Sequence, residues 1–102
     1  MLTSSDVLNE VALIFRVPVV DIKAKNRHDE VVFCRKIFLF VCVTHFKISM
    51  AQLSRMLNRD SSYCKKEMKI INREVINNKS KWVEAWNKYQ KESKIWQHIK
   101  NK

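Results

Sequence analysis

The chain has 102 residues, of which 46% are hydrophobic and 29% are charged, and this excludes a disordered chain and favours one small folded domain. Twenty Lys and Arg residues oppose ten Asp and Glu residues, so the net charge of +10 indicates an anionic partner, either nucleic acid or an acidic membrane surface. Glycine is absent, which excludes P-loops, dinucleotide-binding fingerprints and nucleophile elbows, because each of these needs glycine. We therefore expect no cofactor.

The positive charge is concentrated in the second half of the chain. Residues 1–46 carry six basic and five acidic side chains, a net charge of +1. Residues 47–76 carry seven and three, a net charge of +4, and residues 77–102 carry seven and two, a net charge of +5. An anionic partner is therefore expected to contact the chain mainly after residue 46.

Three cysteines, Cys34, Cys42 and Cys64, form no C-x-x-C pair, and their odd number without a signal peptide predicts a reducing, cytoplasmic location. Cys34, Cys42 and His45 could share one helix face, but a fourth metal ligand is missing, so we interpret the cysteines as small buried residues. The longest apolar run, residues 37–43, has seven residues, whereas a membrane-spanning helix needs about 20. No metal site, membrane span or catalytic arrangement is expected.

The first part of the chain predicts two helices and a loop. Residues 3–6 (TSSD) offer N-caps for an amphipathic helix that should stop near Arg16, before Pro18. Pro18 suits the first turn of a short second helix that runs to about Lys23. Residues 24–28 then form a polar, basic loop. The short helix and the residue before it are expected to bury Val17, Val20 and Ile22.

Residues 29–46 form the most apolar stretch of the chain. Asp29 and Glu30 suit the start of a helix, where negative charge is favourable. Many of the following residues are β-branched or aromatic, so a strand is the alternative interpretation. The stretch is too long for an ordinary strand and contains no turn signal, which favours a central helix packed on several sides.

Two short helical patterns follow, joined by Asn58-Arg59-Asp60. Ser49-Met50-Ala51-Gln52 matches an S-x-x-Q capping box at the start of the first, which should bury its apolar side. Asn58 is the candidate for a left-handed residue in the turn, because asparagine tolerates that conformation best after glycine. Asp60 can cap the second helix. The apolar side consists of Leu53, Met56 and Leu57.

The second of these helices has two different faces. An inward stripe recurs at helical spacing through Cys64, Met68, Ile71 and Val75. Hydroxyl groups at the start of the outward face and cations after them suit a helix that enters the major groove of DNA, where Ser can contact base edges and Lys contacts phosphates. A charged helix that is merely solvated is the alternative. The outward residues are Ser61, Ser62, Lys65, Lys66, Lys69 and Arg73.

The order of these elements resembles the C-terminal DNA-binding domain, domain IV, of the bacterial replication initiator DnaA, over residues 8 to about 75. That family has a short V-x-D-hydrophobic helix, a basic loop, a long helix with an arginine, a Ser-led helix, and then a G-G-R-D-H-[ST]-[ST]-V signature. Here Val19-Val20-Asp21-Ile22 matches the short helix and Lys25-Asn26-Arg27 the loop. Arg35 matches the arginine of the long helix, and Arg59-Asp60 matches the R-D of the signature.

The resemblance implies an all-α, Trp-repressor-like helix-turn-helix bundle at residues 1–76 that binds double-stranded DNA and catalyses nothing. It further implies that Arg27 enters a minor groove beside the contacted major groove. No counterpart of the initiator's ATPase half is recognised, so an ATP-driven activity is not expected. We expect Lys25, Arg27, Arg35, Arg59, Lys65, Lys66 and Lys69 to contact phosphates or the minor groove, and Asp60, Ser61, Ser62 and Tyr63 to lie at or near the bases.

The chain departs from the family signature where bases would be read. Leu57 and Asn58 replace its two glycines, and Ser61 replaces its histidine. Ser62 and Tyr63 take the two hydroxyl positions. The DNA sequence that the family usually recognises is therefore not carried over to this chain.

Residues 77–102 are predicted to form an extra C-terminal helix after a break at Asn77-Asn78-Lys79-Ser80. Its aromatic residues lie on one side, and packing of that side back onto the domain is the favoured interpretation. A surface for a protein partner or a homodimer comes next, with the helix-turn-helix as a scaffold, and an amphipathic helix on an anionic membrane comes last. The stripe consists of Trp82, Trp86, Tyr89, Trp96 and Ile99.

Overall fold

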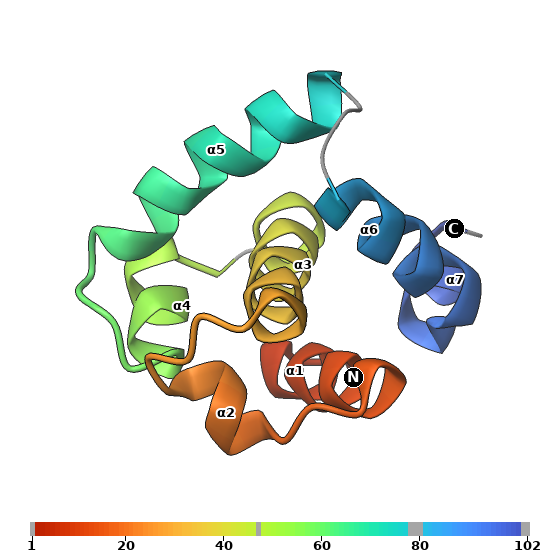
Figure 1. Ribbon diagram of the computed structural model, residues 1–102, viewed down its shortest axis with the longest axis horizontal. Coiled ribbons are helices and arrows are strands. Elements are labelled where there is room, and N and C mark those ends of the chain that lie inside the picture. Colours follow the sequence, from red (N-terminus) through yellow and green to blue (C-terminus); the bar gives the residue numbers. More distant parts are fainter. Residues whose placement is uncertain (1, 47, 78–80, 101–102) are drawn as a thin grey trace.

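The computed structural model describes residues 2–46, 48–77 and 81–100, and within these ranges all regular structure is helical. Figure 1 shows α3 in the centre, with α2, α4 and the start of α5 on one side of it and α6 and α7 on the other. The all-α prediction is confirmed. The helices are α1 (Ser4–Phe15), α2 (Val19–Lys23), α3 (Asp29–His45), α4 (Met50–Met56), α5 (Tyr63–Asn77), α6 (Lys81–Glu92) and α7 (Lys94–Lys100).

The first helix starts where its sequence predicts. The Oγ1 atom of Thr3 accepts a hydrogen bond from the backbone N–H of Asp6, and the Asp6 carboxylate accepts one from the backbone N–H of Thr3 at 2.8 Å. This reciprocal pair satisfies two N–H groups that a helix start leaves without partners. Arg16 ends the helix in the left-handed conformation, with φ of 55°.

The second helix corrects one prediction. Pro18 precedes it with extended backbone, and Val17 and Ile22 are buried as expected. Val20, however, is 70% exposed. Residues two positions apart in a helix point to nearly opposite sides. Because this short helix buries Ile22 against its neighbours, Val20 faces solvent.

The central helix α3 packs against α1, α2, α4, α5 and α6, which explains why nearly all of its sides are apolar. Ile37, Phe38 and Leu39 have no exposed surface, although they are consecutive and point in different directions. The helix interpretation of this stretch is therefore confirmed over the strand. Cys34 and Cys42 are also fully buried, as small core residues.

The pair α4 and α5 has the predicted turn. The Ser49 hydroxyl accepts a hydrogen bond from the backbone N–H of Gln52 at 3.1 Å, and Asn58 has φ of 58°, the predicted left-handed conformation. Helix α5 begins at Tyr63, later than expected, because Ser61 and Ser62 still belong to the turn. The predicted buried residues are confirmed for Leu53, Leu57, Cys64, Met68 and Ile71, and Met56 is half-buried, whereas the side chain of Val75 lies outside the described part.

The C-terminal segment forms two helices instead of the predicted one, and Ser93 lies between them. Trp82 and Tyr89 are fully buried, and Trp86 contacts the rings of Phe40 and Trp96 with centroids 5.0 and 4.9 Å apart. The favoured interpretation, packing back onto the domain, is therefore confirmed. The buried side chains of this stripe are not available to a protein partner, and the predicted break at residues 78–80 lies outside the described residues.

Residues on both sides of position 76 contribute to one hydrophobic core, so the C-terminal helices pack on the same core as the first five.

Glu10, on α1, fixes the position of α7. One carboxylate oxygen of Glu10 accepts hydrogen bonds from the backbone N–H groups of Lys94 and Ile95 at 3.0 and 3.1 Å. The other accepts from the Ser93 hydroxyl and from the Tyr89 hydroxyl at 3.1 Å. We call this arrangement the Glu10 cap.

In the described ranges, no helix is long and apolar enough to cross a membrane.

Candidate nucleic-acid interface

The outward face of α5 is basic and exposed. Lys65, Lys66 and Lys69 are all exposed, while Cys64 and Met68 on the opposite face are buried in the core. The separation of the two faces follows from the sequence, since the buried apolar residues recur at the helical period and most of the remaining positions are polar or charged. An exposed row of ammonium groups on one helix matches the phosphate contacts of helices that lie in a DNA groove.

The turn before α5 presents two exposed hydroxyl groups. Asp60 organises this turn: one of its carboxylate oxygens accepts hydrogen bonds from the backbone N–H of Ser62 at 2.9 Å and from the Ser62 hydroxyl at 3.1 Å. These bonds, the backbone one first, lower the pKa of the exposed Asp60 carboxyl. Asp60 is therefore an ordered anion in the turn, and the lone pairs of the Ser62 hydroxyl remain open to a donor.

Arg35 has a different task from the one expected of it. Its side chain is only 5% exposed, and its guanidinium donates hydrogen bonds to the carbonyl oxygens of Ile22 at 2.7 Å, Ala24 at 2.6 Å and Asp21 at 3.3 Å. Burial, followed by the nearby positive charge of Arg59, lowers the pKa of Arg35. With its donors directed at these carbonyls, Arg35 fixes the end of α2 and is not directed at a phosphate.

Arg59 converges on the same segment from the turn between α4 and α5. Its guanidinium donates to the carbonyl oxygens of Ala24 at 2.7 Å, Lys23 at 3.0 Å and Leu57 at 2.8 Å, and it lies over the ring of Tyr63 at 5.4 Å. Two guanidinium groups thus meet at one carbonyl oxygen, that of Ala24. We call Arg35 and Arg59 the arginine pair. The cations satisfy carbonyls that the end of a helix leaves without partners.

The arginine pair fixes the basic loop, residues 24–28, beside the start of α5. Lys25 and Arg27 in this loop are exposed, and the Asn26 side chain accepts a hydrogen bond from the backbone N–H of His28 at 2.9 Å, which closes a turn. A hollow of about 480 Å³ separates the loop from α5. It is lined by Lys25, Asn26, Arg27, Val32, Arg35, Arg59, Tyr63 and Glu67.

Glu67 is a site residue that sequence reasoning missed. It is half-buried in the wall of this hollow, and its carboxylate accepts a hydrogen bond from the hydroxyl of Tyr63, one turn earlier, at 3.3 Å. Burial, followed by the charge of Glu67, raises the pKa of Tyr63 to about 12. The i, i+4 spacing of the two residues was the available signal. Tyr63 therefore lines the hollow beside the loop, whereas the sequence placed it at or near the bases.

The predicted site residues thus form one surface with two kinds of member. Lys25 and Arg27 of the loop, the hydroxyl groups of the turn and the lysines of α5 lie on neighbouring elements and are exposed. Arg35 and Arg59 lie beneath them and connect those elements. Among the residues that the structure describes, no three His, Cys, Asp or Glu side chains lie close enough to bind a metal ion.

Comparison with known proteins identifies a relationship for most of the chain. The family model described as the bacterial DnaA protein helix-turn-helix matches residues 4–71. This range contains α1 to α4 and the first part of α5, and therefore the whole surface described above. Comparison with curated proteins and with solved structures gave no significant match.

Proposed function

Because the chain belongs to the bacterial DnaA helix-turn-helix family, whose members bind double-stranded DNA in replication initiation, we propose that it binds duplex DNA with α5 in the major groove and the basic loop at the adjacent minor groove. The process that it serves is then the initiation of replication or its regulation. We expect this binding to be sequence-specific, because the exposed hydroxyl groups in the turn before α5 are of a kind that contacts base edges.

The observation that carries this proposal is the arginine pair. A helix and a loop can contact two neighbouring grooves together only if their relative position is fixed before DNA arrives, since otherwise ordering the loop opposes binding. Arg35 and Arg59 supply this fixed position through five hydrogen bonds from guanidinium groups to the carbonyl oxygens of residues 21–24. The exposed cations of the loop and of α5 therefore belong to one rigid surface.

We assign roles to the exposed residues on this basis. Lys25, Lys65, Lys66 and Lys69 contact phosphates, and Arg27 enters the minor groove. Ser61 and Ser62 contact base edges, with Asp60 holding the turn and Tyr63 between the bases and the loop. Because Leu57, Asn58 and Ser61 differ from the family signature, we infer that the preferred DNA sequence differs from the one that the family usually recognises. Selection from a random pool of duplexes would identify it.

The dependence of affinity on salt tests the proposal directly. Five cations at phosphates or in the minor groove predict that log affinity falls with log salt at a slope of about −4 to −5. Lys66→Ala should reduce the steepness of that slope by about one and weaken binding equally on all sequences, because a phosphate contact carries no sequence information. Lys81→Ala, an exposed lysine on α6, is the matched control and should leave the slope unchanged. A slope near zero for the unaltered chain would refute DNA binding.

A further inference from the structure

A second hollow lies between α6 and α7, outside the range that matches the DnaA helix-turn-helix family. Its volume is about 570 Å³. All of its lining side chains can donate a hydrogen bond and none is acidic, although the same two helices carry Glu84 and Glu92. We call it the donor hollow, and it is lined by Asn87, Lys88, Gln90, Lys91, Gln97 and Lys100.

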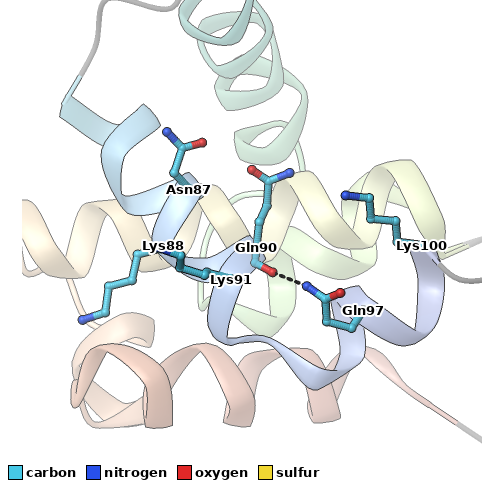
Figure 2. A pocket seen from close by; sticks show the side chains of 6 residues that line it. All are labelled: Asn87, Lys88, Gln90, Lys91, Gln97 and Lys100. Atoms are coloured by element: carbon cyan, nitrogen blue, oxygen red, sulfur yellow. Dashed lines mark hydrogen bonds between the residues drawn. The ribbon is translucent and has the colours of Figure 1, made fainter.

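The two helices that line the donor hollow are held together. The Gln97 side chain on α7 donates a hydrogen bond to the carbonyl oxygen of Gln90 on α6 at 2.7 Å, which connects the two helices across their junction (Figure 2). The Glu10 cap fixes the start of α7 from below. Figure 2 shows Asn87, Gln90 and Lys100 extending on the same side of the helices, while the ammonium group of Lys88 points away from them. The donors are therefore presented by two connected helices and not by a free tail.

The side chains that line the donor hollow favour DNA over a protein or a membrane as its partner. A protein partner usually contributes and requires apolar anchor residues, yet the lining contains none. A helix that lies on a membrane needs an exposed apolar face, yet Trp82, Trp86 and Tyr89 of α6 are buried. Ammonium and amide groups without apolar anchors are the combination that contacts the phosphates and sugars of DNA.

We propose that the donor hollow binds the phosphate backbone of duplex DNA, as a second contact surface besides the one that contains α5. Helices α6 and α7 lie across α3 from α4 and the start of α5 (Figure 1), so the two surfaces are on different sides of the molecule. One molecule can therefore bind two duplex segments at once. Binding of the first duplex segment, through α5, is the proposed function on which this inference rests, whereas binding of the second segment does not depend on it. The net charge of residues 77–102, seven basic against two acidic side chains, supports the attraction of the second segment.

A bridging assay tests this inference. One duplex is immobilised, a labelled duplex is supplied in solution, and the label retained by the protein is measured. The unaltered chain should retain the label, and the double variant Lys91→Gln/Lys100→Gln should retain on the order of tenfold less, because two phosphate contacts are lost. The same variant should bind a single duplex through α5 with little change. The matched control is Lys81→Gln/Lys94→Gln, which removes the same charge from α6 and α7 outside the hollow.

The outcomes separate this inference from the proposed function. Equal losses in the two double variants would mean that only net charge matters, and the inference would be overturned. Binding of one duplex without bridging would overturn the inference and leave the proposed function intact, whereas absence of any duplex binding would remove both. A dimer with one DNA-binding surface on each copy would also bridge two duplexes, so light scattering should measure the oligomeric state of the unaltered chain and of the variant. If the unaltered chain is a dimer and Lys91→Gln/Lys100→Gln is a monomer, the inference would be overturned. Retention of polyglutamate or of phosphatidylserine vesicles through Lys91 and Lys100, without retention of the second duplex, would assign the hollow to that ligand instead.

Discussion

The arginine pair and the Glu10 cap use the same electrostatics with opposite sign at opposite sides of the molecule. Arg35 and Arg59 donate to carbonyl oxygens at the end of α2, where the helix dipole is negative. Glu10 accepts from backbone N–H groups at the start of α7, where the dipole is positive. Both short helices are thus fixed by a charge from another element.

The two arrangements differ in what they position. The arginine pair lies within the family range and fixes the basic loop beside α5, so its loss should change DNA binding as well as stability. The Glu10 cap joins a family residue to α7, beyond that range, so its loss should change stability and the donor hollow but not binding through α5. The comparison shows that the same interaction can serve recognition at one site and attachment of an added segment at another.

Alkaline pH should produce the largest effect, because it acts on the core that both arrangements share. Burial raises the pKa of Cys34 and Cys42 to about 12 and that of Cys64 to about 11, from an ordinary value of 9.0. Between the ordinary pKa and the raised pKa, the unfolded chain releases these protons while the folded chain keeps them. The burial of the thiols therefore costs no free energy of unfolding below pH 9, and the free energy of unfolding falls as the pH rises above 9. At pH 10 the three thiols together should lower the free energy of unfolding by about 4 kcal/mol.

Urea unfolding under reducing conditions at pH 7 and pH 10 measures this difference. Cys42→Ala should shrink the difference between the two pH values by about a third, whatever it does to stability at pH 7. Tyr63 and Tyr89, whose pKa values are also raised, chiefly by burial, add their own loss above pH 10. Equal stability at pH 7 and pH 10 would contradict the burial of the thiols.

Arg35→Met should have the next largest effect. It removes three hydrogen bonds from a buried charged group and leaves the carbonyl oxygens of Ile22 and Asp21 without that donor. The expected loss is about 3 kcal/mol of unfolding free energy, the scale for hydrogen bonds to charged groups. Because the loop loses its support, affinity for duplex DNA should also fall at temperatures where the variant is folded. Denaturant unfolding and DNA titration measure the two losses.

Arg35→Lys is the control for charge alone. Lysine keeps the positive charge but cannot donate to three carbonyl oxygens in a fixed plane, so it should recover only part of the stability and part of the affinity. Full recovery by lysine would show that the geometry of the guanidinium is unimportant. An Arg35→Met variant that unfolds more easily but binds DNA with unchanged affinity would break the link between the arginine pair and recognition.

Sequence reasoning succeeded for features outside these two arrangements. The left-handed Asn58, the Ser49 cap, the central helix and the two faces of α5 were predicted correctly, because each depends on the residue itself or on neighbours within one helical turn. The resemblance to the DnaA helix-turn-helix family was also correct.

The partners that lie far apart in the sequence were not predictable. Arg35 was expected at the DNA, because an arginine on a long helix carries no sign of the carbonyl oxygens, 11 to 14 residues earlier, that it contacts. Glu10 contacts residues more than 80 positions later. The single C-terminal helix was wrong because its continuous amphipathic pattern gives no sign that Ser93 interrupts it. Such pairings are set by packing in three dimensions.

Glu10→Gln should have a smaller effect than Arg35→Met and should test the other half of the comparison. Glutamine keeps an acceptor oxygen but loses the charge that interacts with the start of α7, so the expected loss is up to about 2 kcal/mol of unfolding free energy. Affinity for a single duplex should remain unchanged, while bridging should weaken because the donor hollow is less well fixed. Denaturant unfolding and both binding assays check this. A large loss of single-duplex affinity would show that the two sides are coupled.

Arg27→Ala should cause the smallest loss, and on DNA binding alone. Arg27 is exposed, and no hydrogen bond to it is seen among the described residues, so its removal should leave stability unchanged. An arginine in the minor groove favours A·T-rich flanks, because a narrow minor groove has a more negative potential. The variant should lose roughly 1–2 kcal/mol of binding free energy on a preferred site, and more with A·T than with G·C flanks.

The neighbouring loop residue Lys25 supplies the control for Arg27, since both are exposed and carry one positive charge. Lys25→Ala should cause a smaller loss that is the same on both flanks, because a phosphate contact is independent of sequence. Titration of the two variants against A·T-flanked and G·C-flanked duplexes at one salt concentration measures the four values. Equal losses for both variants on both flanks would mean that the loop contributes only diffuse charge. The arginine pair would then fix the loop for a purely electrostatic contact, and no base sequence would be read there.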